Sequence, residues 1–145
     1  MGKFQVRERI NLPASRVFRY ISNLENTSHW YYAVRPAAPL DEPGALLGAR
    51  YEMTRELPHH VVVTDVVSVT EFDPPRGFGF GTRRGIAPFS YHYHLRDDEG
   101  TTELTLEADV SLPGTAKLLS PVTTQAFKRE MQENLRSLKQ RLEAA

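Results

Sequence analysis

Two histidines set among aromatic residues are the first chemically distinctive feature of this sequence. The stretch FSYHYHL places His92 and His94 two positions apart, alternating with Tyr91 and Tyr93. Residues two positions apart share one face of a β-strand, so a strand here separates the histidines from the tyrosines. Because a sheet with one buried face buries its more apolar set of side chains, we expect the tyrosines to point inward and the histidines to point to solvent.

A zinc site is the alternative interpretation of these histidines. Together with His59 or His60 from another strand, His92 and His94 could supply three nitrogen ligands. That arrangement requires inward histidines, which the alternation opposes, so we expect neither a metal nor another cofactor. Ser90 falls on the histidine face, and the order of residues alone assembles no Ser-His-Asp set. A hydrolase is therefore not predicted.

Two charged residues fall in phase with apolar side chains that we expect to face inward. Arg55 shares its alternation with Met53, and Asp65 shares its alternation with flanking valines. An inward guanidinium could hold a carboxylate or a polyketide oxygen, although the strand could equally end there and leave Arg55 in water. An inward Asp65 could act as a general acid or base, whereas a solvated position or an ion pair is the alternative. The candidate catalytic residues are therefore Arg55, Asp65 and Tyr93.

The glycines of the stretch GFGFG, residues 77–81, leave one strand face almost without side chains. Their G-x-G-x-G spacing differs from that of dinucleotide-binding loops, and the stretch does not join a strand to a helix within a βαβ unit. We therefore interpret the glycines as positions that permit sheet curvature or a β-bulge.

Composition narrows the class of protein. The chain has 145 residues, of which 40% are hydrophobic and 25% are charged, which is typical of one globular domain covering residues 1–145. Eighteen basic and 18 acidic residues give no net charge, so nucleic acid is not an expected partner. There is no cysteine, the first eight residues include charged ones, and no apolar run suits a membrane helix. We expect a cytoplasmic protein that does not insert into membranes; the oligomeric state stays open.

The periodicity predicts an α+β domain. A first strand at 4–10 precedes two short helices, one after Pro13 and one near His29, and a meander of about six strands follows. The clearest strands are expected at 50–55, 59–72, 76–83, 89–95 and 104–112. A final helix from about Thr115 to Glu143 would be roughly 40 Å long, enough to cross the sheet. We therefore predict a curved antiparallel sheet of six to seven strands wrapped around a long C-terminal helix.

Four stretches of sequence are distinctive in this order of elements: INLPASRVFRYISNLENTSHW (10–30), VTEFDPPRGFGF (69–80), GTTELTLEADV (100–110) and the last thirty residues. With them, the chain resembles the START-like superfamily (SRPBCC, the helix-grip fold), of polyketide cyclase/dehydrase and lipid-transport type. The resemblance implies a cavity for a mostly apolar ligand between the sheet and the long helix. It transfers no catalytic residue, because the shared motifs are structural.

We therefore expect the chain to bind a small hydrophobic molecule, such as a lipid, an aromatic compound or a polyketide-like compound. A cyclase or dehydratase acting in the same cavity is the second hypothesis, and a domain that acts through a partner protein is the third. Arg55 is the expected polar anchor, and inward aromatic residues supply apolar area. The expected ligand-binding residues are Trp30, Tyr51, Met53, Arg55, Phe78, Phe80, Phe89, Tyr91, Tyr93, Leu106, Ala108, Phe127 and Met131.

Overall fold

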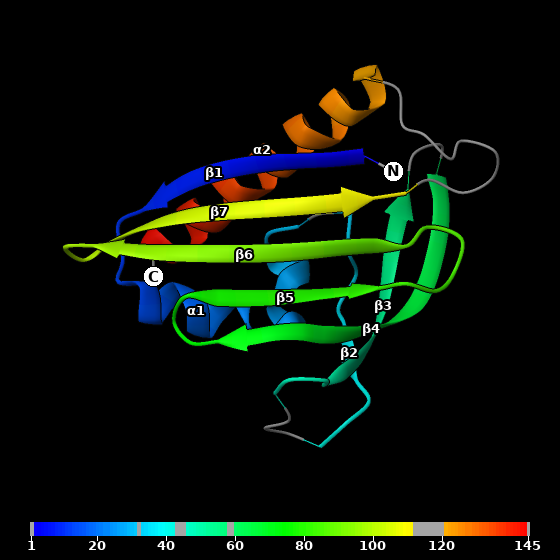
Figure 1. Ribbon diagram of the computed structural model, residues 1–145, viewed down its shortest axis with the longest axis horizontal. Helices are drawn as coiled ribbons and strands as arrows, with labels where there is room; N and C mark the ends of the chain where they lie inside the picture. Colours follow the sequence, from blue (N-terminus) through cyan, green and yellow to red (C-terminus); the bar gives the residue numbers. More distant parts are fainter. Residues whose placement is uncertain (1, 32, 43–45, 58–59, 112–120, 145) are drawn as a thin grey trace.

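A computed structural model describes residues 2–31, 33–42, 46–57, 60–111 and 121–144. It contains one antiparallel sheet with the helices on one side (Figure 1). The elements in chain order are β1 (Gly2–Ile10), α1 (Ala14–Ile21), the 3-10 helix η1 (Leu24–His29), β2 (Ala38–Pro39), β3 (Arg50–Leu57), β4 (Val61–Asp73), β5 (Gly77–Thr82), β6 (Phe89–Asp98), β7 (Thr101–Val110) and α2 (Pro121–Ala144). The predicted helix-grip architecture is confirmed.

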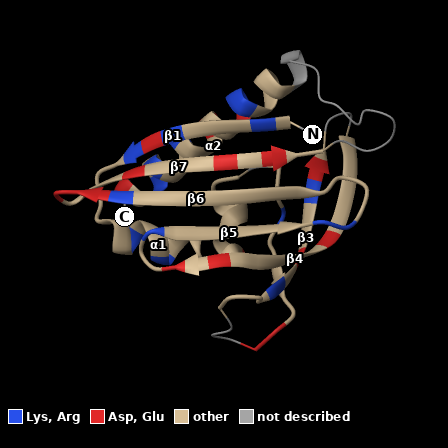
Figure 2. Cartoon of the chain, in the orientation of Figure 1, with Lys and Arg blue, Asp and Glu red and all other residues tan. Residues whose placement is uncertain are grey.

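The seven strands are arranged in the order β1-β7-β6-β5-β4-β3-β2, and every neighbouring pair is antiparallel. The central strands alternate between buried and more exposed side chains, as a sheet with one buried face requires. In β7, for example, Leu104 and Leu106 are fully buried, and Thr105 between them is not. In Figure 1 the sheet lies in front of α1 and α2, so the reader looks at its outer face. Acidic and basic residues are interspersed along the strands (Figure 2).

The short helices close one end of the sheet. Val17, Phe18 and Ile21 are buried on one face of α1, and the ring of Phe18 meets that of Phe78 edge-on at 6.2 Å. Pro13 has no side chain that could cap α1, so the Asp97 carboxylate accepts a hydrogen bond from the Ala14 N–H at 2.9 Å instead. This hydrogen bond is the main reason why the pKa of Asp97 is lowered.

The C-terminal helix α2 runs along the inner side of the sheet. Met131, Leu135, Leu138 and Leu142 recur at three- and four-residue spacing and are all buried. Two hydrogen bonds of 2.7 Å fix α2 against β1, from Gln132 Nε2 and Lys139 Nζ to backbone carbonyls. The predicted helix is present from Pro121; the predicted start at Thr115 lies outside the described residues.

A β-bulge lies in β4, beside the glycine-rich strand β5. The register with β5 shifts between Val69 and Glu71. The predicted bulge therefore exists, but it belongs to the neighbouring strand rather than to the glycines. The shift places Glu71 opposite Gly79 on the outer face of the sheet.

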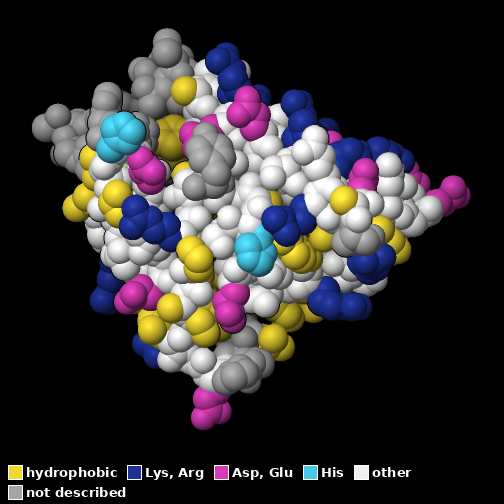
Figure 3. All heavy atoms as spheres, turned by 180° about the vertical axis from the view of Figure 1, so that it is seen from behind, with side chains coloured by type: hydrophobic (Ala, Val, Ile, Leu, Met, Phe, Trp, Pro, Cys, Tyr) yellow, Lys and Arg dark blue, Asp and Glu magenta, His cyan; other side chains and the backbone are white. Residues whose placement is uncertain are grey.

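The opposite face of the molecule is shown in Figure 3. Hydrophobic side chains form small groups among charged side chains of both signs. The described part of this face therefore lacks the continuous apolar patch expected for the third hypothesis, a domain that acts through a partner protein. Within the described residues, no helix is long and apolar enough to cross a membrane.

Candidate functional site

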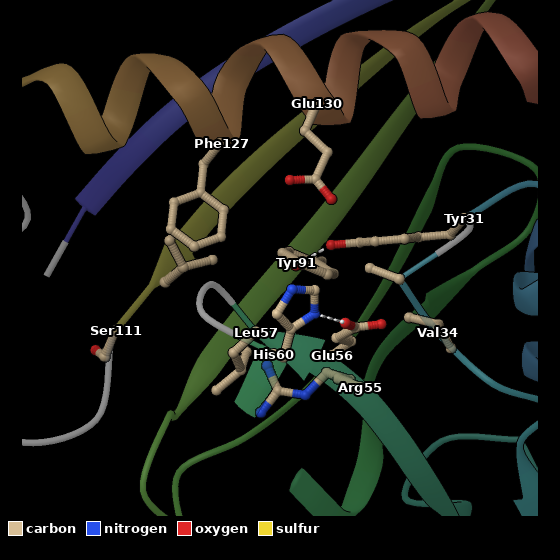
Figure 4. A pocket seen from close by; sticks show the side chains of 12 residues that line it. Tyr31, Val34, Arg55, Glu56, Leu57, His60, Tyr91, Ser111, Phe127 and Glu130 are labelled. Atoms are coloured by element: carbon tan, nitrogen blue, oxygen red, sulfur yellow. Dashed lines mark hydrogen bonds and ion pairs between the residues drawn. The ribbon is translucent and has the colours of Figure 1, made fainter. Parts of the chain in front are cut away.

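A cavity of about 380 Å³ lies between α2, β3 and β6. Tyr31, Ala33 and Val34, which follow η1, form its side wall, and the ends of β3 and β7 reach its rim. Figure 4 shows side chains from all of these segments converging on it. Its lining residues are Tyr31, Ala33, Val34, Arg55, Glu56, Leu57, His60, Tyr91, Val110, Ser111, Phe127 and Glu130.

Two buried tyrosine hydroxyls meet inside this cavity. The Oη atoms of Tyr31 and Tyr91 are 3.1 Å apart, and Figure 4 shows the two rings reaching toward one another. Burial raises the pKa of Tyr91, and it raises that of Tyr31 well above its usual range, with further contributions from Tyr91 and Glu130. Both hydroxyls therefore stay protonated at neutral pH. One of the two hydroxyl hydrogens forms the hydrogen bond between the tyrosines, so the other hydroxyl hydrogen can be donated to a ligand.

Arg55 lies on the floor of the cavity and is already bound to other groups. Its Nη2 donates to Asp65 Oδ2 at 3.1 Å and to the carbonyl oxygen of Ala87 at 2.9 Å. Its guanidinium lies 4.2 Å from the ring centre of Phe89. Only 7% of Arg55 is exposed, which excludes the solvated position. Its buried Nε has no hydrogen-bond partner among the described residues.

Carboxylates are the other charged groups of the cavity wall. Glu130 extends from α2 toward the tyrosine pair (Figure 4), and Glu56 Oε1 lies 2.9 Å from His60 Nδ1 near the exposed rim. The charge of Arg55 is balanced by Asp65, which lies behind the wall. The described lining residues therefore leave an excess of negative charge facing the cavity.

Three of the expected ligand-binding residues line the cavity: Arg55, Tyr91 and Phe127. Most of the others are buried in the hydrophobic core, and Tyr51 is partly exposed beside a separate depression near η1. Contact of these residues with a ligand stays a prediction. The core positions are Trp30, Met53, Phe78, Phe80, Phe89, Tyr93, Leu106, Ala108 and Met131.

The three candidate catalytic residues are not brought together in the cavity. Arg55 and Asp65 form an ion pair, the alternative considered for Asp65, and only Arg55 lines the wall. Tyr93 is 1% exposed, and its hydroxyl has no partner among the described residues. Burial raises the pKa of Tyr93 well above its usual range, so this group stays neutral.

Some lining residues were missed by sequence reasoning. Glu130 lies three residues after Phe127 on the same face of α2, and Leu57 lies two residues after Arg55 on β3, so helical and strand periodicity could have found both. Tyr31 belongs to an irregular segment, where no periodicity applies. Its hydroxyl contact with Tyr91 depends on the tertiary fold.

The two histidines of β6 lie outside the cavity. Tyr91 and Tyr93 are 5% and 1% exposed, whereas the side chains of His92 and His94 are 40% and 49% exposed, as the alternation predicts. The described residues contain no group of three His, Asp or Glu side chains positioned to hold a metal ion. His59, one of the proposed third ligands, lies outside the described residues.

Comparison with known proteins supports this fold. Residues 1–143 match the family model described as polyketide cyclase/dehydrase and lipid transport. A START superfamily protein from Mycobacterium smegmatis has a TM-score of 0.82 at 11% identity, with 99% of each chain covered. A protein from Thermus thermophilus has a TM-score of 0.79 at 17% identity, with 98% of this chain and 97% of that chain covered.

A third similar structure is the di-domain ARO/CYC BexL from the BE-7585A biosynthetic pathway. Its TM-score is 0.69 at 15% identity, and the match covers 99% of this chain and 47% of that chain. A comparison with curated protein sequences gave no match. Since the family model spans nearly the whole sequence, the chain belongs to the polyketide cyclase/dehydrase and lipid transport family, and it has the helix-grip fold of START-like proteins.

Proposed function

We propose that this protein binds a small, mostly apolar and uncharged molecule that carries a hydroxyl or carbonyl group, in the cavity between the sheet and α2. The observation that carries the proposal is the buried pair of hydroxyls of Tyr31 and Tyr91, 3.1 Å apart in the cavity wall. The volume of about 380 Å³ lies in the range of small-molecule sites, roughly 300–1,000 Å³.

Apolar side chains beside the hydroxyls of the tyrosine pair suit such a ligand. Val34, Leu57, Val110 and Phe127 offer hydrocarbon and aromatic surface, which favours transfer of an apolar molecule from water. The hydrogen left over by the tyrosine pair can be donated to a ligand oxygen, and this hydrogen bond would orient the molecule.

The charges of the wall favour a neutral ligand over an anion. A ligand carboxylate would meet the carboxylates of Glu56 and Glu130, whereas the guanidinium of Arg55 is already paired with Asp65. Like charges brought together in a partly desolvated cavity repel one another strongly. Hydrophobic alcohols, phenols and ketones are therefore the expected ligand class.

Calorimetric titration with a matched pair of probes tests this function. We expect 2-naphthol, which is neutral at neutral pH, to bind at least about ten times more tightly than 2-naphthoate, a difference of about 1.4 kcal/mol. Replacing Glu130 by glutamine should narrow this difference, because it removes one repelling charge. Equal or tighter binding of 2-naphthoate would contradict the proposed ligand class, and binding of neither probe would contradict the proposed function.

Removal of both cavity hydroxyls should weaken binding measurably. We expect the double variant Tyr31→Phe with Tyr91→Phe to lower the affinity for 2-naphthol about tenfold, because the donated hydrogen bond contributes about 1 kcal/mol or slightly more and neither tyrosine can then replace the other. The matched control is Tyr20→Phe, since the Tyr20 hydroxyl contacts His29 at 3.4 Å and lies outside this cavity. The same calorimetric titration measures the double variant and the control. An unchanged affinity in the double variant would place the binding site elsewhere.

A second candidate function is cyclisation or dehydration of such a ligand, favoured by the approach of Glu130 to the tyrosine pair. The neutral hydroxyls could donate to a ligand carbonyl, and Glu130 could remove a proton from the adjacent carbon. This function predicts that a poly-β-ketone substrate loses water in the presence of the protein and not with Glu130→Gln. Mass spectrometry distinguishes the two candidates, because a binding protein returns the ligand unchanged.

A further inference from the structure

The outer face of the sheet, away from the cavity, carries a chain of three hydrogen-bonding side chains. Ser90 Oγ lies 3.1 Å from His92 Nε2, and His92 Nδ1 lies 3.3 Å from Glu71 Oε1. The Glu71 carboxylate has no hydrogen to donate, so in this contact the neutral imidazole carries its hydrogen on Nδ1. The unprotonated Nε2 then accepts the hydrogen bond from the Ser90 hydroxyl. The order serine, histidine, carboxylate and the choice of nitrogens match the arrangement that activates a serine nucleophile.

Local backbone features make room for these side chains. The β-bulge in β4 turns Glu71 to the outer face, opposite β5. A Cβ atom at Gly79 would lie 2.8 Å from His92 Nδ1, and one at Gly77 would lie 2.5 Å from Glu71 Oε2. Both contacts are too close for a real side chain, so the two glycines leave the space that the imidazole and the carboxylate occupy. Gly81 has a different reason, since a Cβ atom there would meet the backbone carbonyl oxygen of Phe89.

A depression of about 450 Å³ adjoins the serine and the histidine. Its outward side chains are polar, since Phe4 and Ala108 beside it point to the inner face of the sheet. Lys3 and Gln5 carry N–H groups that can donate to a carbonyl oxygen. The carboxylates of Glu107 and Asp109 also line it, which disfavours an anionic substrate. The depression therefore suits a small uncharged molecule with a carbonyl group.

We propose that Ser90, His92 and Glu71 form a second chemical site, at which Ser90 accepts the acyl group of a small aryl ester. Ser90 Oγ bonds to the ester carbonyl carbon while its proton passes to His92 Nε2. The bond between the carbonyl carbon and the aryl oxygen breaks, and the imidazolium returns the proton to the departing phenolate. Glu71 is a positioning residue, which holds the ring and stabilises its positive charge.

Water completes the reaction by the reverse route. His92 takes a proton from a water molecule whose oxygen bonds to the acyl carbon. The bond to Ser90 Oγ then breaks, and the proton returns to the serine. The balance is one ester and one water converted into one carboxylic acid and one phenol. The reaction is independent of the cavity between the sheet and α2.

Covalent labelling of Ser90 tests the proposal. The protein is incubated with p-nitrophenyl acetate, quenched in acid and digested, and acetylated peptides are measured by mass spectrometry. We expect acetyl-Ser90 in the unchanged protein, none in Ser90→Ala, and a rate about 100-fold lower in His92→Ala, which lacks the general base. An alkyl fluorophosphonate, whose serine adduct resists hydrolysis, gives the same comparison if the acetyl group turns over quickly.

The neighbouring His94 supplies a matched control. His94 Nε2 lies 3.7 Å from Glu107 Oε1, on the same face and strand as His92. Thr105 lies opposite His94, but none of the described hydrogen bonds joins its hydroxyl to the ring. His94→Ala should therefore leave Ser90 labelling unchanged. Glu71→Ala should slow labelling, and it should also shift the ¹⁵N NMR signals of His92 away from the Nδ1–H tautomer, which a purely structural role would not do.

Two results would overturn the proposal. One is modification of lysines or the amino terminus without Ser90 by both reagents. The other is Ser90 labelling at the same rate in His92→Ala. Neither result bears on ligand binding in the cavity, because no residue of the outer site lines it.

Discussion

Replacing Asp65 by asparagine is expected to lower the free energy of unfolding by about 3 kcal/mol, because it leaves the buried guanidinium of Arg55 without a counter-charge. The side chains of Arg55 and Asp65 are only 9% and 14% exposed, so water replaces the lost carboxylate poorly. The same guanidinium binds the carbonyl oxygen of Ala87, so its loss of order would also loosen the segment before β6. Urea denaturation followed by circular dichroism measures the change.

An exposed ion pair of the same chemical type provides the control. Arg9 and Asp98 are 3.4 Å apart, with side chains 56% and 53% exposed. Asp98→Asn should change the stability little, since exposed pairs are well solvated in both states. Equal effects of Asp65→Asn and Asp98→Asn would show that Arg55 is not held by a buried ion pair.

Filling the cavity should abolish binding of the neutral probe. Ala33 lines the cavity and is only partly buried, so Ala33→Trp can extend an indole ring into the space of about 380 Å³. We expect the affinity for 2-naphthol to fall at least about 100-fold, which corresponds to about 2.7 kcal/mol. Calorimetric titration gives the affinity, and circular dichroism checks that the variant is folded.

A second tryptophan variant separates occlusion from a general effect of the indole ring. Ala126 is exposed on α2, and Ala126→Trp adds the same side chain outside the cavity. This variant should bind 2-naphthol as the unchanged protein does. If folded Ala33→Trp retains full affinity, the ligand binds outside the cavity and the proposed function fails. Labelling of Ser90 should be the same in both variants.

The sequence predicted the fold because its periodic segments are strong and consistent. Alternation in the stretch 89–95 correctly separates tyrosines from histidines, and the apolar spacing after Pro121 correctly predicts a helix that covers the sheet. These patterns depend only on which face of an element is buried. They hold in any fold that packs a helix on one side of this sheet.

The extent of the cavity could not be predicted in the same way. The inner face of the sheet is longer than the cavity, and the short helices fill much of it. Phe18 packs on Phe78, and Trp30 meets Tyr93 edge-on at 6.3 Å. These aromatic residues therefore belong to the hydrophobic core and not to the cavity wall. Alternation identifies an inward side chain and does not say what covers it.

Side-chain contacts between neighbouring strands could not be predicted from the sequence either. Arg55 and Asp65 both fall in phase with inward side chains, with a solvated position open for each, and their ion pair depends on the register that sets Asp65 opposite Met53, diagonal to Arg55. Glu71 reaches His92 only because of the bulge between Val69 and Glu71, which shifts the alternation of β4. A one-residue irregularity of this kind changes the face of the side chains that follow it.

A crystal structure of the protein with 2-naphthol would locate the ligand itself. We expect the naphthalene rings between Phe127 and Tyr91, with the ligand hydroxyl within hydrogen-bonding distance, about 2.7–3.0 Å, of the Oη of Tyr31 or Tyr91. A ligand found outside this cavity, or bound in it with its hydroxyl turned away from both tyrosines, would overturn the proposed function.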